Sequence, residues 1–207
     1  MSSQISDKPQ ESSGDGCEIK AGRPRCPLAH LNILKATREL LDEVGFTCLT
    51  IEGIAARAGV GKTTIYRRWP NKASIVMDAF FEETSPKTHF ADSGDVREDI
   101  RRQVRKMVKE LSGPTGRKVA TLLANGQFDE EMAEAFRLRW IEHRRNEACQ
   151  VIRRGIERGE IRKDVNPEVL VDALYGPIYF RLLGGHAPLT RHFADELAEL
   201  VISGLDD

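Results

Sequence analysis

Apolar residues along most of this chain recur at intervals of three, four and seven, the period of an amphipathic helix. The pattern begins in the segment 28–45, where Leu31, Leu34 and Leu41 share one face. Later segments keep this period, and residues that favour turns separate them. They predict helices near 72–83, 95–111, 115–126, 129–158, 167–184 and 191–204. We therefore expect an all-α fold.

Two short helices are predicted between the first helix and the one near 72–83. Thr50 is a suitable N-cap for a helix over 51–58, and Gly59 ends that helix after about two turns. A further helix over 62–69 runs into Pro70, whose ring cannot continue a helix. Two short helices joined by a tight turn, packed against a longer one, predict a helix-turn-helix.

Charge is distributed unevenly along the chain, although the 207 residues carry a net charge of only −1. Residues 20–75 hold ten Lys and Arg against four Asp and Glu. A basic module within an otherwise acidic chain favours contact with a polyanion, because each cation near a phosphate releases condensed counterions. The four cysteines show no metal or disulfide spacing, so we expect no metal and no cofactor.

The segment 49–72, Leu-Thr-Ile-Glu-Gly-Ile-Ala-Ala-Arg-Ala-Gly-Val-Gly-Lys-Thr-Thr-Ile-Tyr-Arg-Arg-Trp-Pro-Asn-Lys, resembles the DNA-binding signature of the TetR family of bacterial repressors. The Ser-, Gly-, Asp- and Glu-rich composition of 1–22 predicts a disordered tail. The resemblance implies a three-helix DNA-binding domain over 23–75 and a helical regulatory and dimerisation domain over 76–207. It implies that phosphates are held by Thr50, Tyr66 and Lys72, and that bases are faced by Lys62, Thr63, Thr64 and Arg67. Gly53 within the second helix and Gly61 at the start of the third depart from the usual pattern.

A short basic arm precedes the first helix, with Arg23 and Arg25 on either side of a proline. An extended arm of this kind can place arginine side chains in a narrow minor groove. The alternative is an ordinary solvated tail.

One competing motif lies in the same region, because the segment 59–64, Gly-Val-Gly-Lys-Thr-Thr, is similar to the end of a phosphate-binding P-loop. That motif requires a glycine where this chain has Ala56, and it requires a preceding strand. Both requirements fail, so nucleotide binding is not expected.

The segment 175–189 resembles the penultimate helix of one branch of TetR-family C-terminal domains. In that family the last two helices pair with their copies across a two-fold axis. The predicted dimer contacts are Leu170, Leu174, Ile178, Leu182, Phe193, Leu197, Leu200, Val201 and Leu205. The alternative is that this apolar stripe packs only within the chain.

The resemblance also implies a pocket for a small-molecule effector. Candidate lining residues are Met107, Phe128, Met132, Phe136, Trp140, His143, Tyr175 and Tyr179, although such residues often fill a core instead. The arginines between 137 and 158 alternate with glutamates, which favours a solvated, salt-bridged face.

These features together predict a homodimeric repressor that binds a palindromic double-stranded DNA operator and is released by a small-molecule effector. A helical enzyme would need catalytic spacing that we do not find, and an adaptor would not need the basic helix-turn-helix. A transcriptional activator with the same helix-turn-helix domain is an open alternative. The polar N-terminus and the short apolar runs predict a cytoplasmic protein that does not enter a membrane.

Overall fold

The computed structural model describes residues 27–84 and 90–205. Within these ranges the chain is all helical and contains no strand, as the apolar period predicts. The elements are α1 (Pro27–Cys48), α2 (Ile51–Ala58), α3 (Lys62–Tyr66), α4 (Lys72–Thr84), α5 (Val96–Leu111), α6 (Pro114–Asn125), α7 (Glu130–Phe136), the π-helical segment η2 (Arg137–Glu142), α8 (His143–Glu157), α9 (Pro167–Gly184) and α10 (Arg191–Ile202). None of these helices has the length and apolarity needed to cross a membrane. The predicted tail over 1–22 and the basic arm with Arg23 and Arg25 lie outside the described residues.

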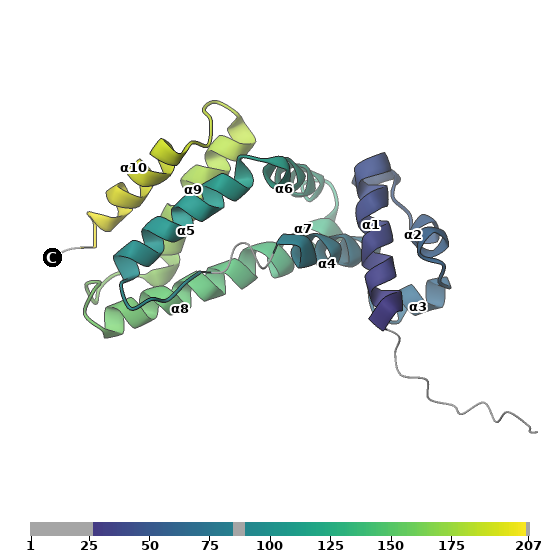
Figure 1. Ribbon diagram of the computed structural model, residues 1–207, viewed down its shortest axis with the longest axis horizontal. Helices are drawn as coiled ribbons and strands as arrows, with labels where there is room; N and C mark the ends of the chain where they lie inside the picture. Colours follow the sequence, from purple (N-terminus) through teal and green to yellow (C-terminus); the bar gives the residue numbers. More distant parts are fainter. Residues whose placement is uncertain (1–26, 85–89, 206–207) are drawn as a thin grey trace, which may run out of the picture.

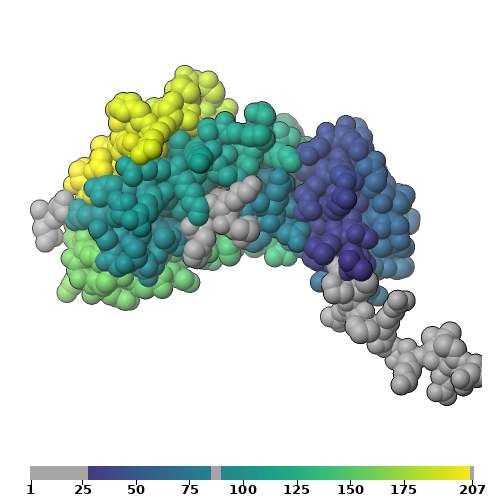
Figure 2. Space-filling model, viewed as in Figure 1, coloured from purple at the N-terminus to yellow at the C-terminus, as the bar shows by residue number. Residues whose placement is uncertain are grey.

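The helices form a small head and a larger body (Figure 1). The head consists of α1, α2 and α3, and α4 packs against α1 while extending into the body. At the far end of the molecule α10 lies along α5, beside α9 (Figure 1). The space-filling view shows the head and the last two helices at opposite ends of the surface (Figure 2).

Local capping sets the helices of the head. The Thr50 hydroxyl oxygen accepts a hydrogen bond from the Gly53 amide at 3.1 Å, which confirms the predicted N-cap of α2. Gly59 ends α2 with φ 67° and ψ 34°, a left-handed conformation that favours glycine. Asn71 accepts hydrogen bonds from the Ser74 amide and hydroxyl at the start of α4. Short-range sequence signals therefore determine where these helices begin and end.

The end of α1 differs from the prediction. The backbone breaks at Gly45, with φ 72° and ψ 171°, but helical structure resumes and continues to Cys48. The Lys72 ammonium then donates hydrogen bonds to the carbonyls of Phe46 at 3.0 Å and Leu49 at 3.1 Å. A cation from α4 therefore satisfies main-chain oxygens in the last turn of α1 and just after it.

The long helix predicted over 129–158 is interrupted by a π-helical segment. Helical structure runs through α7, η2 and α8, but residues 137–142 adopt the wider π turn. Trp140 lies in this segment and is completely buried, with its ring 4.9 Å from that of Phe80 on α4. Single π turns occur often at functional sites in helices.

The predicted dimer stripe of α9 and α10 faces mainly into the chain's own core. Five of its residues are at most 8% exposed: Leu170, Leu174, Ile178, Phe193 and Leu197. Leu205 is also buried, while Leu182 and Val201 are partly buried against the core. These buried side chains pack within the chain, where α10 contacts α5 and α9 contacts α8, which favours the alternative of intrachain packing over a dimer contact for them. Leu200 is 73% exposed, so its predicted dimer contact stays a prediction.

A second apolar stripe on α9 faces outward. Its residues are Val169, Ala173, Gly176, Phe180 and Leu183, spaced by four, three, four and three, and all five are exposed. We call this set the outer stripe. Helical periodicity did not identify it, because α9 is apolar on both its inner and outer sides.

Candidate DNA interface and buried cavity

The third helix presents a polar face to solvent. Ile65 is fully buried and anchors α3 against the head, so the opposite side of the helix is exposed. The exposed set comprises Lys62, Thr63, Tyr66 and Arg67, with Thr64 half-buried beside it. The structure therefore brings the predicted base-facing residues together on one surface with the hydrogen-bond donors that DNA contacts use.

Lys62 is engaged in an ion pair across the helix-turn-helix. Its ammonium lies 2.9 Å from the carboxylate of Glu52 in the first turn of α2. The hydrogen bond from Lys62 lowers the pKa of Glu52, and the same bond raises the pKa of Lys62. An acidic group on α2 therefore offsets the charge of this lysine.

Two predicted phosphate contacts are already used within the head. Thr50 caps α2, although its side chain stays exposed. The Lys72 ammonium binds main-chain carbonyls and lies 4.5 Å from the centroid of the Phe46 ring. The Lys72 ammonium is therefore engaged at the end of α1, and its predicted phosphate contact stays a prediction.

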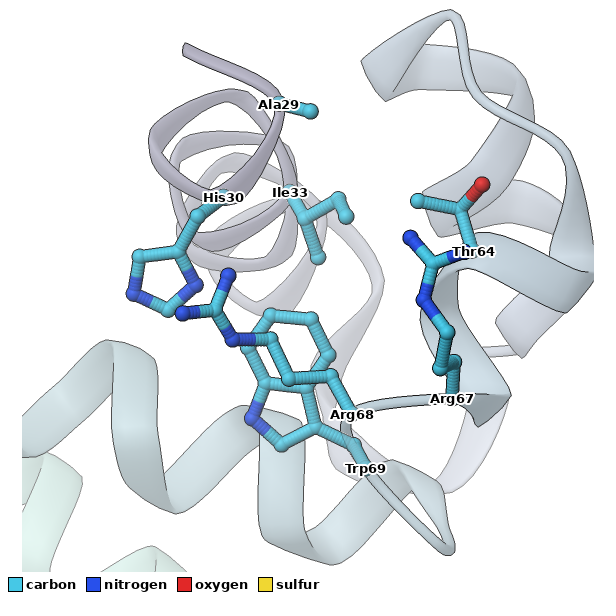
Figure 3. Close-up of a pocket in the computed structure, with 7 residues that line it drawn as sticks. All are labelled: Ala29, His30, Ile33, Thr64, Arg67, Arg68 and Trp69. Atoms are coloured by element: carbon cyan, nitrogen blue, oxygen red, sulfur yellow. The ribbon is translucent and has the colours of Figure 1, made fainter. Parts of the chain in front are cut away.

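A hollow of about 190 Å³ lies between α1 and the end of α3. Figure 3 shows the Arg68 side chain reaching toward His30 on α1, beside Trp69, while the Arg67 side chain lies beside Thr64. The imidazole and indole rings stack at 5.3 Å with an interplanar angle of 7°, and the Arg68 guanidinium lies 5.7 Å from the indole centroid. This hollow adds two basic side chains, His30 and Arg68, next to the α3 surface. Neither was predicted from the sequence, although Arg68 follows the predicted Arg67 directly.

Trp69 also connects the head to the body. Its indole N–H donates a hydrogen bond to Asp78 on α4, and the same carboxylate lies 2.9 Å from the Arg139 guanidinium in η2. Sequence patterns gave no signal for this contact, because it joins three elements that are separate along the chain.

A cavity of about 300 Å³ lies in the body, between α5, η2, α8 and α9. Its walls are mainly apolar and aromatic. Arg144 lines it, is only 3% exposed, and stacks with its guanidinium carbon 3.3 Å from the centroid of the Trp140 ring. Burial lowers the pKa of Arg144 to about 10, so the group stays cationic at neutral pH.

Two tyrosines complete the cavity. The Tyr175 hydroxyl accepts a hydrogen bond from the Gln103 amide at 3.1 Å, and the Tyr179 hydroxyl accepts one from the Trp140 indole at 2.5 Å. Burial raises the pKa of Tyr179 to about 12 and places the pKa of Tyr175 well above its ordinary value. Both phenols are therefore neutral and able to donate at physiological pH.

The predicted pocket residues divide into two groups. Met107, Trp140, Tyr175 and Tyr179 line the cavity, whereas the other four do not. Met132 and Phe136 are buried in the core, Phe128 is 95% exposed, and the exposed His143 lies edge-on to Phe81. These four assignments are wrong for this cavity, because helical spacing alone does not show which side of a helix faces a hollow.

Arg144 was also misplaced by the charge pattern, which assigned it to a solvated face. It lies one helical turn after Trp140, and this i, i+4 relation to a buried aromatic residue is the signal that would have identified it.

The geometry defines a class of protein: a helix-turn-helix head with an exposed polar third helix, joined to a helical body with a partly open cavity. The family described as "Bacterial regulatory proteins, tetR family" matches residues 33–79, and "Tetracyclin repressor-like, C-terminal domain" matches residues 90–201. The chain therefore belongs to the TetR family of transcriptional regulators and has its helix-turn-helix DNA-binding head.

Individual relatives agree with this assignment. The HTH-type transcriptional regulator YdeS of Bacillus subtilis (strain 168) is 39% identical over 166 residues, which cover 80% of this chain and 84% of that protein. The DNA-binding transcriptional repressor TetR of Mycobacteroides abscessus is 26% identical, with coverages of 82% and 90%. The crystal structure of the TetR-family regulator SCO0332 is 35% identical and superposes with a TM-score of 0.74, covering 86% of this chain and 99% of that one.

Proposed function

We propose that this protein represses transcription by binding a palindromic DNA operator as a homodimer, and that a small molecule in the body releases it. One observation carries the proposal. The same chain has an exposed polar α3 and a cavity lined by residues of η2 and α9. Repression is supported by the similar protein of Mycobacteroides abscessus, which is named a repressor.

The DNA contacts are assigned to the head. Lys62, Thr63 and Arg67 face bases in the major groove from α3 and the turn after it, with Thr64 beside them. Tyr66, 53% exposed, and Thr50 contact the phosphate backbone on either side of the groove. Arg23 and Arg25, outside the described residues, are proposed to enter the adjacent minor groove.

The homodimer is assigned to the outer stripe of α9, together with Leu200 of α10. These residues present a row of exposed apolar side chains, and Ala173 and Gly176 at its centre allow two helix backbones to approach closely. A second copy of the chain, related by a two-fold axis, covers such a stripe with the same stripe. That symmetry places two α3 helices toward successive major grooves, about 34 Å apart along the DNA.

Selection of bound duplexes from a random DNA pool tests the proposal. The purified protein is compared with a Lys62→Ala, Arg67→Ala variant and with a control, Arg153→Ala, Lys163→Ala, that removes the same charge from exposed positions in the body. The proposal predicts a palindrome enriched by the wild type and the control but not by the head variant. A pool without an enriched motif from a folded protein would contradict the proposal.

A further inference from the structure

The cavity in the body carries a positive charge in an apolar wall. Arg144 is almost fully buried, stacks on Trp140, and donates through Nη1 to the Trp140 carbonyl at 3.3 Å. Burial has a larger effect on its pKa than the charges of Glu147 and Glu110. A guanidinium in a low-dielectric wall attracts anions more strongly than one in water, and its planar fork matches the geometry of a carboxylate.

The other charged residues that line the cavity do not cancel its attraction for anions. Arg145 and Asp172 both line the cavity, but they form an ion pair with each other, and Arg145 also lies 3.3 Å from Glu168. Among the lining residues, the charges of Arg145 and Asp172 offset one another, and Glu168 does not line the cavity. Arg144 therefore sets the sign of the charge that the cavity favours.

The two phenols add donors beside this charge. Each hydroxyl oxygen already accepts a hydrogen bond, Tyr175 from Gln103 and Tyr179 from Trp140. Each phenol keeps its own O–H to donate. A group that only accepts hydrogen bonds suits these donors, whereas an ammonium group does not.

The remaining walls are apolar and limit the ligand's size. Met107, Ile141 and Val171 contribute side chains without charge. A volume of about 300 Å³ holds roughly ten groups the size of a water molecule, at ~30 Å³ each. We infer that the effector is a small amphipathic acid, with an aliphatic or aromatic body among the apolar walls and a carboxylate or similar anionic group held by Arg144, Tyr175 and Tyr179. This inference rests on the proposed function, because it names the chemical class of the effector.

Isothermal titration calorimetry on the full chain, without DNA, tests the inference. The probes are octanoate and phenylbutyrate, each compared with the alcohol and the amine of the same carbon skeleton. We expect at least one acid to bind, and to bind about tenfold or more tightly than its alcohol, with the amine weaker still. No binding of either acid, equal binding of acid and alcohol, or tighter binding of an amine would overturn the inference.

Variants link the preference to the named residues. Arg144→Gln is expected to abolish the acid-to-alcohol preference, and Tyr179→Phe to reduce it while leaving the cavity's shape nearly unchanged. The matched control is Arg153→Gln, which removes an exposed arginine of the same helix that does not line the cavity and should keep the preference. If Arg144→Gln does not fold, as judged by circular dichroism, Tyr175→Phe, Tyr179→Phe replaces it. A preference that survives in the folded variants would contradict the assignment.

Operator binding, measured separately by fluorescence anisotropy, distinguishes the two claims. Acid binding without operator release would support the ligand class and contradict release by this ligand. Operator binding by a protein that shows no preference for acids would support the proposed function and overturn the inference.

Discussion

The Trp69 indole N–H donates a hydrogen bond to Asp78 Oδ2 at 2.8 Å. The other oxygen of that carboxylate lies 2.9 Å from Nε of Arg139, the residue before the cavity-lining Trp140. A single carboxylate on α4 therefore joins the turn that follows α3 to the segment that forms part of the cavity wall. A ligand that shifts η2 acts directly on a residue bound to the DNA-reading head.

Removing the Arg139 contact should reduce communication between cavity and head. In Arg139→Ala the Trp69–Asp78 bond remains, so we expect operator affinity without ligand to change less than about twofold. We expect the ratio of operator Kd values with and without a cavity-binding acid to fall at least about threefold, since couplings between sites are typically ~5- to 150-fold. Arg137→Ala, in the same segment but paired with Glu142, is the control and should keep the ratio. Equal ratios in both variants would exclude this contact as a link.

Neutralising Glu52 should strengthen DNA binding. Glu52→Gln removes a negative charge from the DNA-facing side and frees Lys62 from its ion pair. We expect operator affinity to rise by roughly two- to fivefold at low salt, because exposed ion pairs are weak and easily exchanged. Anisotropy titrations at increasing salt measure the effect, which should shrink as salt screens the charges. The control Glu130→Gln, exposed at the start of α7, should have no effect, and a loss of affinity in Glu52→Gln would contradict the account.

The turn between α2 and α3 should depend on glycine at position 59. A side chain there meets no atom within 4 Å, so the cost of Gly59→Ala comes from φ 67° alone. We expect a loss of about 1–2 kcal/mol in the free energy of unfolding, measured by denaturant titration. Gly204→Ala, where the added carbon makes only an ordinary contact at 3.5 Å, should cost less. Equal costs at both positions would show that backbone strain is not the cause.

Substitutions at two exposed phenylalanines should distinguish the proposed dimer surface from the rest of the body surface. Phe180, 69% exposed, lies in the outer stripe, whereas Phe128, 95% exposed, lies in the turn after α6. We expect Phe180→Asp to raise the dimer dissociation constant at least about tenfold, because a charge placed in an apolar interface is left without a partner. Phe128→Asp should leave the dimer intact. Sedimentation velocity measures both, and an unchanged dimer in Phe180→Asp would place the interface elsewhere.

The features that could be predicted from the sequence are those with local causes. The Thr50 cap and the Gly59 turn act within a few residues, so the order of the head helices and the polar face of α3 could be predicted. The third helix was predicted to run to Pro70, but α3 ends at Tyr66. The π turn at 137–142 carries no such signal, and the long helix was predicted without it.

Tertiary packing determines which way several side chains face, and the sequence pattern did not predict this. α9 is apolar on two sides, so its period did not show that Leu174 faces the core and Phe180 faces solvent. Arg144 lies among charged neighbours in the sequence, yet it turns inward onto Trp140. In both cases the orientation of the side chain depends on helices that are distant along the chain.

The most direct test of the central claim is the stoichiometry and half-site dependence of operator binding. Native mass spectrometry and anisotropy would use the selected palindrome and a duplex with one half-site scrambled. The account predicts two chains on each palindrome and an affinity at least about a hundredfold lower for the scrambled duplex, since several base contacts of ~1–3 kcal/mol each are lost. A single chain on each palindrome, or equal affinity for the two duplexes, would contradict it.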